Sequence, residues 1–171
     1  CRDVGQLYEA IKTLTVRGAP AIGVAGAYGL VLSIQNLNSI SDVLECLKKA
    51  ADYLSSSRPT AVNLSWALTR VKNKAEDFAA RNKATLRELQ EVVLNEANAI
   101  CQEDVDMCRR IGENGEKFIR DGAGILTHCN AGALATAGQG TALSVMFEAH
   151  KKGRKFKVYV DETRPLLQGA R

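Results

Sequence analysis

Several patterns that mark common classes of protein are missing from this sequence. Its five cysteines, at positions 1, 46, 101, 108 and 129, are widely spaced and form no CxxC pair. Such cysteines are typical of reduced thiols in a cytoplasmic protein, and they argue against a disulfide framework or a zinc site. Lysine and arginine form no run interleaved with aromatic residues, and the net charge is only +4. Nucleic acid is therefore a poor candidate partner, and we expect no metal site.

Long apolar runs are also missing. The longest stretch without charge extends from residue 18 to residue 41, but its apolar part ends near Ile34 and contains glycines 23, 26 and 29. A membrane span needs about 20 consecutive apolar residues, so we expect a buried helix and no membrane partner. The three glycines leave a stripe against which another backbone can pack closely. No basic and apolar leader opens the chain, and we expect it to begin inside a larger protein.

Helical periodicity dominates the first 120 residues. Apolar residues recur at helical spacing from Val4 to Leu14, and the uncharged segment predicts a second helix over 21–34. Three further helices are expected: one capped by Ser39 or Ser41, one over 64–81, and one that starts at a capping box formed by Thr85 and Glu88 and reaches toward Arg110. Gly112 and Gly115 are expected to break or bend the last of them.

The pattern changes after residue 121. GILTH (124–128) predicts a strand, CNAG a turn, residues 131–153 a helix, and KFKVYV (155–160) a second strand. Strand, helix and strand in this order form the βαβ unit of a parallel sheet. We therefore expect an α/β fold with a helical N-terminal domain (1–120), followed by the first βαβ unit of a Rossmann-like parallel sheet (121–171) that is truncated.

Cys129 is the first candidate for chemistry. In an open α/β sheet, ligands bind at the carboxyl ends of the strands, beside the N-termini of the following helices. Cys129 follows the strand GILTH directly, so its sulfur should lie where a helix dipole and free N–H groups favour a thiolate or a phosphate. A buried structural cysteine is the competing interpretation. His128 should point to the opposite face of the strand, which favours a packing or supporting role over that of a base.

Arginine lies close to each of the three prolines, in Arg17-Gly-Ala-Pro20, Arg58-Pro59 and Arg164-Pro165. The planar guanidinium suits phosphate, so these loops would form an anion pocket if they converge; otherwise they are solvated turns. Gln168 follows a strand end, where its amide could bond a sugar hydroxyl. Glu162 could hold Arg164 in place or take part in catalysis. GALATAGQG matches neither GxGxxG nor a Walker sequence, so a nucleotide site is not supported.

Four blocks of sequence resemble the methylthioribose-1-phosphate isomerases of methionine salvage, and together they extend over essentially the whole chain. These enzymes belong to a superfamily shared with ribose-1,5-bisphosphate isomerases and the regulatory subunits of translation initiation factor 2B. RGAPAIG and THCNAG favour the methylthioribose enzymes within it. The four blocks are VRGAPAIGVAGAYGL (16–30), SSRPTAVNL (56–64), GILTHCNAGALATAGQGTAL (124–143) and DETRPLLQGAR (161–171).

The resemblance implies an isomerisation without a cofactor: 5-methylthioribose 1-phosphate, an aldose, becomes 5-methylthioribulose 1-phosphate, a ketose. It implies that Cys129 relays a proton between C2 and C1, and that Gln168 contacts the sugar. It also implies that the phosphate is held by Arg17, by the backbone of Gly18 and Ala19, and by Arg58. Relatives commonly form homodimers.

The resemblance also implies a second catalytic group, an aspartate in a downstream GADR block, which does not occur in these 171 residues. We therefore expect the chain to be about half of a longer enzyme, to be inactive alone, and to leave apolar faces that pair with the remainder of that enzyme. A ribose-1,5-bisphosphate isomerase and a non-catalytic subunit resembling those of initiation factor 2B are the alternatives.

Overall fold

The computed structural model describes residues 1–81 and 84–170. The chain forms two compact units, one from Cys1 to Cys101 and one from Gln102 onward. The predicted domain boundary at residue 120 falls inside the second unit.

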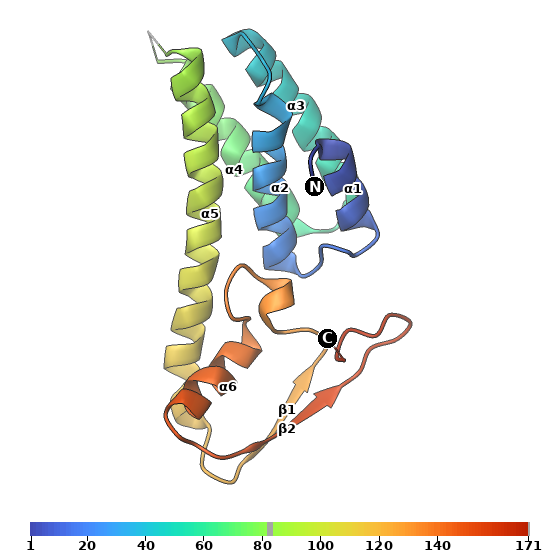
Figure 1. The fold of residues 1–171 in the computed structure, drawn as a ribbon, viewed down its shortest axis with the longest axis vertical. Coiled ribbons are helices and arrows are strands. Elements are labelled where there is room, and N and C mark those ends of the chain that lie inside the picture. The colour runs from blue at the N-terminus through green and yellow to red at the C-terminus, as the bar shows by residue number, and fades with distance from the viewer. Residues whose placement is uncertain (82–83, 171) are drawn as a thin grey trace. The chain divides into compact units, whose positions relative to one another are not determined.

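The first unit is a bundle of helices, as the sequence periodicity predicts (Figure 1). The segments that separate the first four helices contain Gly18, Ser39 and Pro59. Ser39 accepts a hydrogen bond of 3.1 Å from the backbone N–H of Asp42 and so caps the third helix. The helices are α1 (Val4–Lys12), α2 (Ala19–Ile34), α3 (Ile40–Ser57), α4 (Val62–Ala79) and α5 (Leu86–Gly115), the last of which continues into the second unit.

The predicted capping box is present at the start of α5. Thr85 donates its backbone N–H to the Glu88 carboxylate at 2.9 Å, and Glu88 returns its N–H to the Thr85 hydroxyl at 3.3 Å. Two backbone groups that helix geometry leaves without partners are thereby satisfied. The start of this long helix is thus determined by local sequence.

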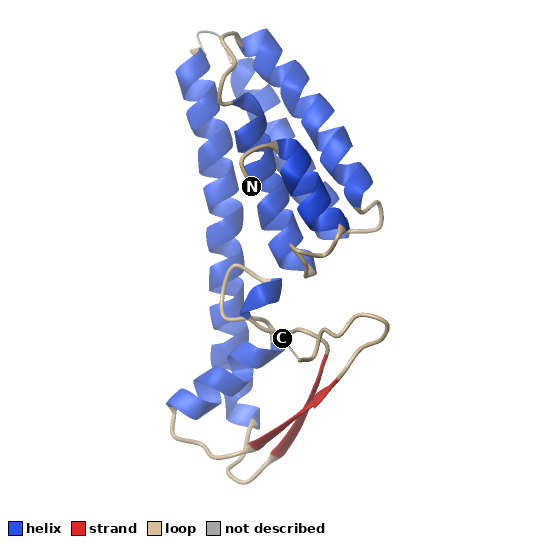
Figure 2. Ribbon diagram, turned by 45° about the vertical axis from the view of Figure 1, so that its right-hand side comes forward, coloured by secondary structure: helices blue, strands red, loops and turns tan. Residues whose placement is uncertain are grey.

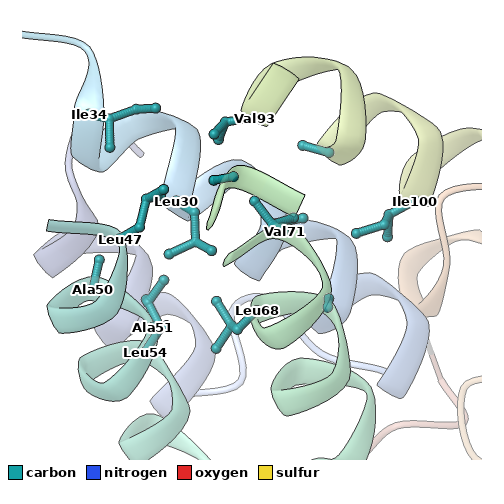
Figure 3. Close-up of a cluster of buried hydrophobic side chains, with 14 of the residues drawn as sticks. Leu30, Ile34, Leu47, Ala50, Ala51, Leu54, Leu68, Val71, Val93 and Ile100 are labelled. Carbon is teal, nitrogen blue, oxygen red and sulfur yellow. The ribbon is translucent and has the colours of Figure 1, made fainter. Parts of the chain in front are cut away.

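The core of the first unit consists of aliphatic side chains from all five helices, α1 to α5, and several of these side chains are labelled in Figure 3. The glycine stripe of α2 faces this core, but at Gly26 and Gly29 side chains pack on it in place of the second backbone that we predicted. A Cβ atom at Gly26 would lie 2.5 Å from Leu64 Cδ1, and one at Gly29 would lie 2.5 Å from Leu7 Cδ2. The glycines therefore allow neighbouring side chains to pack directly on the α2 backbone.

The second unit contains the predicted strands β1 (Gly124–His128) and β2 (Lys157–Asp161), which pair in parallel (Figure 2). Helix α6 (Ala142–Lys151) connects them, with the short 3₁₀ helices η1 (Glu116–Phe118) and η2 (Ala133–Ala135) beside it in sequence. In the register of the sheet, Gly124 lies opposite Lys157 and His128 lies opposite Asp161. The α/β fold class is confirmed.

Two sequence predictions about this unit are wrong. The helix after Cys129 does not begin near residue 131: the segment is a loop with one 3₁₀ turn, and α6 begins only at Ala142. Of the two glycines expected to break or bend α5, Gly115 ends the helix as predicted, whereas Gly112 lies inside it. A Cβ atom at Gly112 would lie 2.8 Å from the Ser144 carbonyl oxygen, so this glycine permits a close approach of α6 to α5.

Glu116 anchors the turn between α6 and β2. Its side chain is buried, and the carboxylate lies 2.6 Å from Lys152 Nζ and 2.8 Å from Arg154 Nη2. Arg154 also donates to the carbonyl oxygens of Glu116 and Ile119. Two cations therefore neutralise one buried acid, as burial of a carboxylate requires.

Apolar side chains remain exposed on the small sheet. Leu126 is 67% exposed, Tyr159 56% and Val160 49%. Beside them, an apolar groove of about 500 Å³ is lined by Leu143, Met146, Phe147, Phe156 and Val158 together with His150, Arg154 and Lys155. Across the described residues, none of the helices combines the length and the hydropathy needed to cross a membrane.

Candidate functional site

Cys129 occupies an unusual backbone conformation at the carboxyl end of β1. Its φ angle is +63°, in the left-handed region that L-residues other than glycine rarely adopt. The residue is half-buried, and its backbone N–H donates a hydrogen bond of 3.3 Å to the carbonyl oxygen of Asp161 at the end of β2. Strained backbone of this kind is enriched at active sites, because the surrounding structure must hold it in place.

The loop after Cys129 replaces the helix N-terminus that we expected beside the thiol. Asn130 accepts a hydrogen bond of 3.2 Å from the Gly132 N–H, and the Ala131 carbonyl oxygen accepts the N–H of Thr141 at 3.0 Å. Gly132 and Gly140 form an isolated antiparallel bridge. The loop is therefore closed by its own backbone, and the predicted contribution of a helix dipole at Cys129 is not available.

Gln168 lies in a loop that the carboxylate of Glu162 organises. Glu162 accepts backbone N–H groups from Gly169 at 2.5 Å, Thr163 at 2.8 Å and Ala170 at 2.9 Å. These donors, Gly169 first among them, hold the pKa of Glu162 below its usual value. The side chain of Gln168 is half-buried. Glu162 thus fixes the segment that presents Gln168.

The Cys129 turn and the Gln168 loop meet at Asp161. The carbonyl oxygen of Asp161 accepts the Cys129 N–H, and a Cβ atom at Gly169 would lie 2.7 Å from that same oxygen. The absence of a side chain at Gly169 lets the loop pass this close. Two of the predicted site residues are therefore brought to one edge of the sheet.

The predicted phosphate-binding residues lie in the first unit. Arg17 and Gly18 directly precede α2, whose first residue is Ala19; Gly18 has a φ angle of +87°. Arg58 follows the last residue of α3 and is half-buried. One turn into α2, a Cβ atom at Gly23 would lie 3.0 Å from the carbonyl oxygen of Asn63, near the start of α4.

This contact brings the loops that contain Arg17 and Arg58 to the same end of the helical bundle (Figure 1). The start of α2 leaves backbone N–H groups directed outward, which is a favourable site for an anion. The structure therefore forms two groups of predicted residues, one in each unit: Arg17, Gly18, Ala19 and Arg58 in the first, and Cys129 and Gln168 in the second.

Sequence reasoning missed Asp104 and the structural role of Glu162. Asp104 lies on α5 and is only 5% exposed. It occupies a position in the apolar stripe of this helix, which is otherwise formed by Leu89, Val93, Ala97, Ile100 and Cys108. An acid at a core position of a helical repeat is a signal that the sequence contained. Within residues 1–81 and 84–170, no three His, Cys, Asp or Glu side chains could together hold a metal ion.

Residues 15–171 match the Initiation factor 2 subunit family. This chain belongs to that family. The match includes both groups of candidate residues, the Arg17 loop and the Cys129 turn.

Relatives of the family are similar over the whole chain. It is 51% identical over 173 aligned residues to the methylthioribose-1-phosphate isomerase of Desulforamulus reducens, covering 100% of this chain and 49% of the relative. It is 52% identical over 172 residues to the 5-deoxyribose 1-phosphate isomerase of Moorella thermoacetica, covering 99% and 48%. The chain therefore spans about half the length of the curated relatives it matches.

Solved structures support the same relationship. The crystal structure of 5-methylthioribose 1-phosphate isomerase from Pyrococcus horikoshii OT3 is 44% identical and superposes with a TM-score of 0.90, over 99% of this chain and 47% of that one. A structure described as translation initiation factor eIF-2B, subunit delta, from A. fulgidus is 45% identical, with a TM-score of 0.87 over 100% and 49%. The described fold is therefore that of the family.

Proposed function

We propose that this chain is the cysteine-bearing part of a sugar-phosphate isomerase that converts 5-methylthioribose 1-phosphate to 5-methylthioribulose 1-phosphate. The observation that carries the proposal is the left-handed conformation of Cys129 at a strand end, beside the loop of Gln168. The names of relatives about half identical to the chain support the reaction class.

The reaction moves one hydrogen and opens one ring. Protonation of the ring oxygen lets its bond to C1 break, and removal of the hydrogen on C2 leaves a double bond between C1 and C2. Return of a proton to C1, with loss of the proton from the C2 hydroxyl, gives the ketone without any external oxidant. In the proposed mechanism Cys129 carries the proton between C2 and C1, and an acid elsewhere in the enzyme protonates the ring oxygen.

The substrate-binding roles follow the chemistry of the two residue groups. Arg17, Arg58 and the N-terminus of α2 would hold the phosphate, because guanidinium groups and outward backbone N–H groups both favour an anion. Gln168 would hydrogen-bond a sugar hydroxyl.

The remainder of the enzyme is proposed to cover the apolar side chains that are exposed on both faces of the sheet. The chain matches about half of its relatives' length, while Leu126, Tyr159 and Val160 stay exposed beside an apolar groove. Light scattering of a chain extended to the relatives' full length should show one discrete species, which we expect to be a homodimer. The 171-residue chain should self-associate or aggregate, and a stable 18.5 kDa monomer would contradict this expectation.

The decisive experiment is an NMR assay with 5-methylthioribose 1-phosphate. The extended chain should form the ketose, the 171-residue chain should not, and Cys129→Ser in the extended chain should reduce kcat by about 10³-fold. Cys1→Ser, which changes an exposed cysteine, is the matched control and should retain full activity. An extended chain that binds the sugar phosphate without converting it would refute the proposal.

The same assay in D₂O tests the role of Cys129. Deuterium at C1 of the product would establish proton transfer with solvent exchange. A direct hydride shift from C2 to C1 would leave C1 free of solvent deuterium, with Cys129 only shaping the pocket. A product without label that forms equally fast with Cys129→Ser would therefore exclude the thiol as the proton carrier.

A second candidate substrate is 5-deoxyribose 1-phosphate, because a relative 52% identical to this chain is named for it. The two sugars differ at C5, so competition between them in one NMR sample measures the ratio of kcat/KM values directly. The competing non-catalytic interpretation is supported by the solved structure described as an initiation factor subunit. It requires no thiol at the strand end, and the Cys129→Ser comparison separates it from the enzyme.

A further inference from the structure

Asp104 holds the loop that follows Cys129. Its side chain is 5% exposed, and its Oδ2 atom accepts a hydrogen bond of 2.6 Å from the backbone N–H of Ala137. Its Oδ1 atom is buried and has no hydrogen-bond partner in the part of the chain that the structure describes. Burial of a carboxylate costs free energy. The hydrogen bond from the loop amide to Asp104 is the interaction in the structure that offsets this cost.

The same loop also packs closely against α5 near Asp104. A Cβ atom at Gly138 would lie 2.9 Å from Cys108 Cβ and 3.3 Å from the Cα atom of Val105. Real side chains essentially never approach this closely, so only glycine allows the loop to rest on the helix. The glycine contact and the carboxylate bond are independent observations that locate the same loop on the same helix face.

Hydrogen bonds and backbone contacts within the loop connect the region packed against α5 to Cys129. Thr136 donates its hydroxyl to the carbonyl oxygen of Gly138 at 3.1 Å and accepts the N–H of Gly140 at 3.1 Å. The α-carbon of Gly140 packs against the backbone of Ala131 and Gly132, where an added Cβ atom would lie 2.4 Å from the Ala131 carbonyl oxygen. Ala131 is two residues after Cys129, so a displacement of the loop would also displace the strained turn at Cys129.

We propose that Asp104 is a positioning residue for Cys129: through Ala137 and the loop 136–141, it keeps the thiol in its left-handed conformation at the end of β1. The inference rests on the proposed function, because the position of the thiol matters for catalysis only if Cys129 reacts. Asp104 itself does not touch the substrate in this arrangement.

The test measures the state of the thiol separately from catalysis. In the extended chain, alkylation of Cys129 by iodoacetamide is followed by mass spectrometry of its peptide, relative to the exposed Cys1 in the same sample. Four variants are compared: Asp104→Ala, Asp104→Asn, Gly138→Ala, and the control Asp106→Asn. Asp106 lies on the same helix with its side chain 48% exposed and pairs with Arg109 at 3.7 Å rather than with the loop, so it is the matched control for removal of a charge.

Loosening the loop should expose the half-buried thiol. We expect Asp104→Ala and Gly138→Ala, which act by different routes, each to raise the Cys129/Cys1 alkylation ratio by about tenfold. They should lower kcat by about tenfold or more while KM changes less than about threefold, because the thiol and not the substrate is displaced. Asp104→Asn keeps an oxygen for the Ala137 N–H and should stay within about threefold of the parent. Asp106→Asn should match the parent.

A lower melting temperature in Asp104→Ala with an unchanged alkylation ratio in both loop variants would overturn the proposal, since Asp104 would then serve stability alone. If Asp104→Ala does not fold, Gly138→Ala decides the question, because it leaves the carboxylate intact. An unaltered parent chain without isomerase activity would count against the proposed function instead. The alkylation ratio is measured without substrate, so the two failures are distinguishable.

Discussion

The backbone N–H of Cys129 donates to the carbonyl oxygen of Asp161, joining the residue after β1 to the last residue of β2. This bond continues the parallel ladder one step beyond the register pair His128 and Asp161. The thiol turn and the Gln168 loop are consequently fixed to the same point of the sheet. The site residues of the second unit therefore depend on strand pairing rather than on a helix N-terminus.

Substitution of Gly169 by alanine should disturb substrate binding. The new Cβ atom would lie 2.7 Å from the Asp161 carbonyl oxygen and 3.2 Å from Glu162 Oε1, so the Gln168 loop must move. We expect KM for the sugar phosphate to rise by roughly tenfold, about 1.4 kcal/mol of lost binding, with a smaller change in kcat. Steady-state kinetics of the extended chain provides the measurement. Equal KM values for the two proteins would show that Gln168 does not contact the substrate.

Glu162 should make the stability of the Gln168 loop depend on pH in the acid range. Its pKa is lowered from the ordinary value of 4.5 by the backbone donors, Gly169 first. The ionised form is favoured in the folded state, so its stabilising contribution is complete above about pH 4.5 and is lost as the pH falls through the lower folded value.

Glutamine at this position cannot ionise. The difference in melting temperature between the parent and Glu162→Gln should therefore be constant above about pH 4.5 and shrink as the pH falls further. Other acids titrate equally in both proteins, so the comparison isolates Glu162. A difference that does not depend on pH would contradict this assignment.

Valine in place of Gly29 should destabilise the helical bundle. An added Cβ atom would lie 2.5 Å from Leu7 Cδ2 and 2.8 Å from Leu54 Cδ1, both in a packed core. Overpacking of this kind costs about 1–3 kcal/mol in the free energy of unfolding. Urea denaturation followed by circular dichroism measures it. An unchanged midpoint would mean that the two leucines move aside without loss of packing.

Removal of the capping box should weaken the start of α5. Thr85→Ala loses the hydroxyl that accepts the Glu88 N–H, and we expect a loss of about 1 kcal/mol in the free energy of unfolding. Thr69→Ala, an exposed threonine inside α4, serves as the control and should change stability by less than about 0.5 kcal/mol. Equal effects of the two substitutions would assign the loss to something other than capping.

Local chemistry determined much of the fold from the sequence alone. The capping box, the Ser39 cap and the strand segments each depend on residues within a few positions of one another, and the structure contains them all. The glycine stripe of α2 was also readable, because a helix repeats its faces every 3.6 residues. The family blocks predict Cys129 and the Arg17 loop as site residues from the sequence alone.

Tertiary contacts decided those features of the fold that local sequence patterns predict wrongly or do not predict. Gly112 lies inside α5, where it permits the close approach of α6, and residues 131–141 form a loop because Asp104, Gly138 and Gly140 fix their backbone against other segments. Alanine-rich sequence favours a helix only while nothing else satisfies its backbone. The left-handed turn at Cys129 is held in the same way, by the hydrogen bond that its backbone N–H donates to the carbonyl oxygen of Asp161, a residue distant along the chain. Sequence spacing does not encode such bonds, whereas the folded backbone brings their partners together.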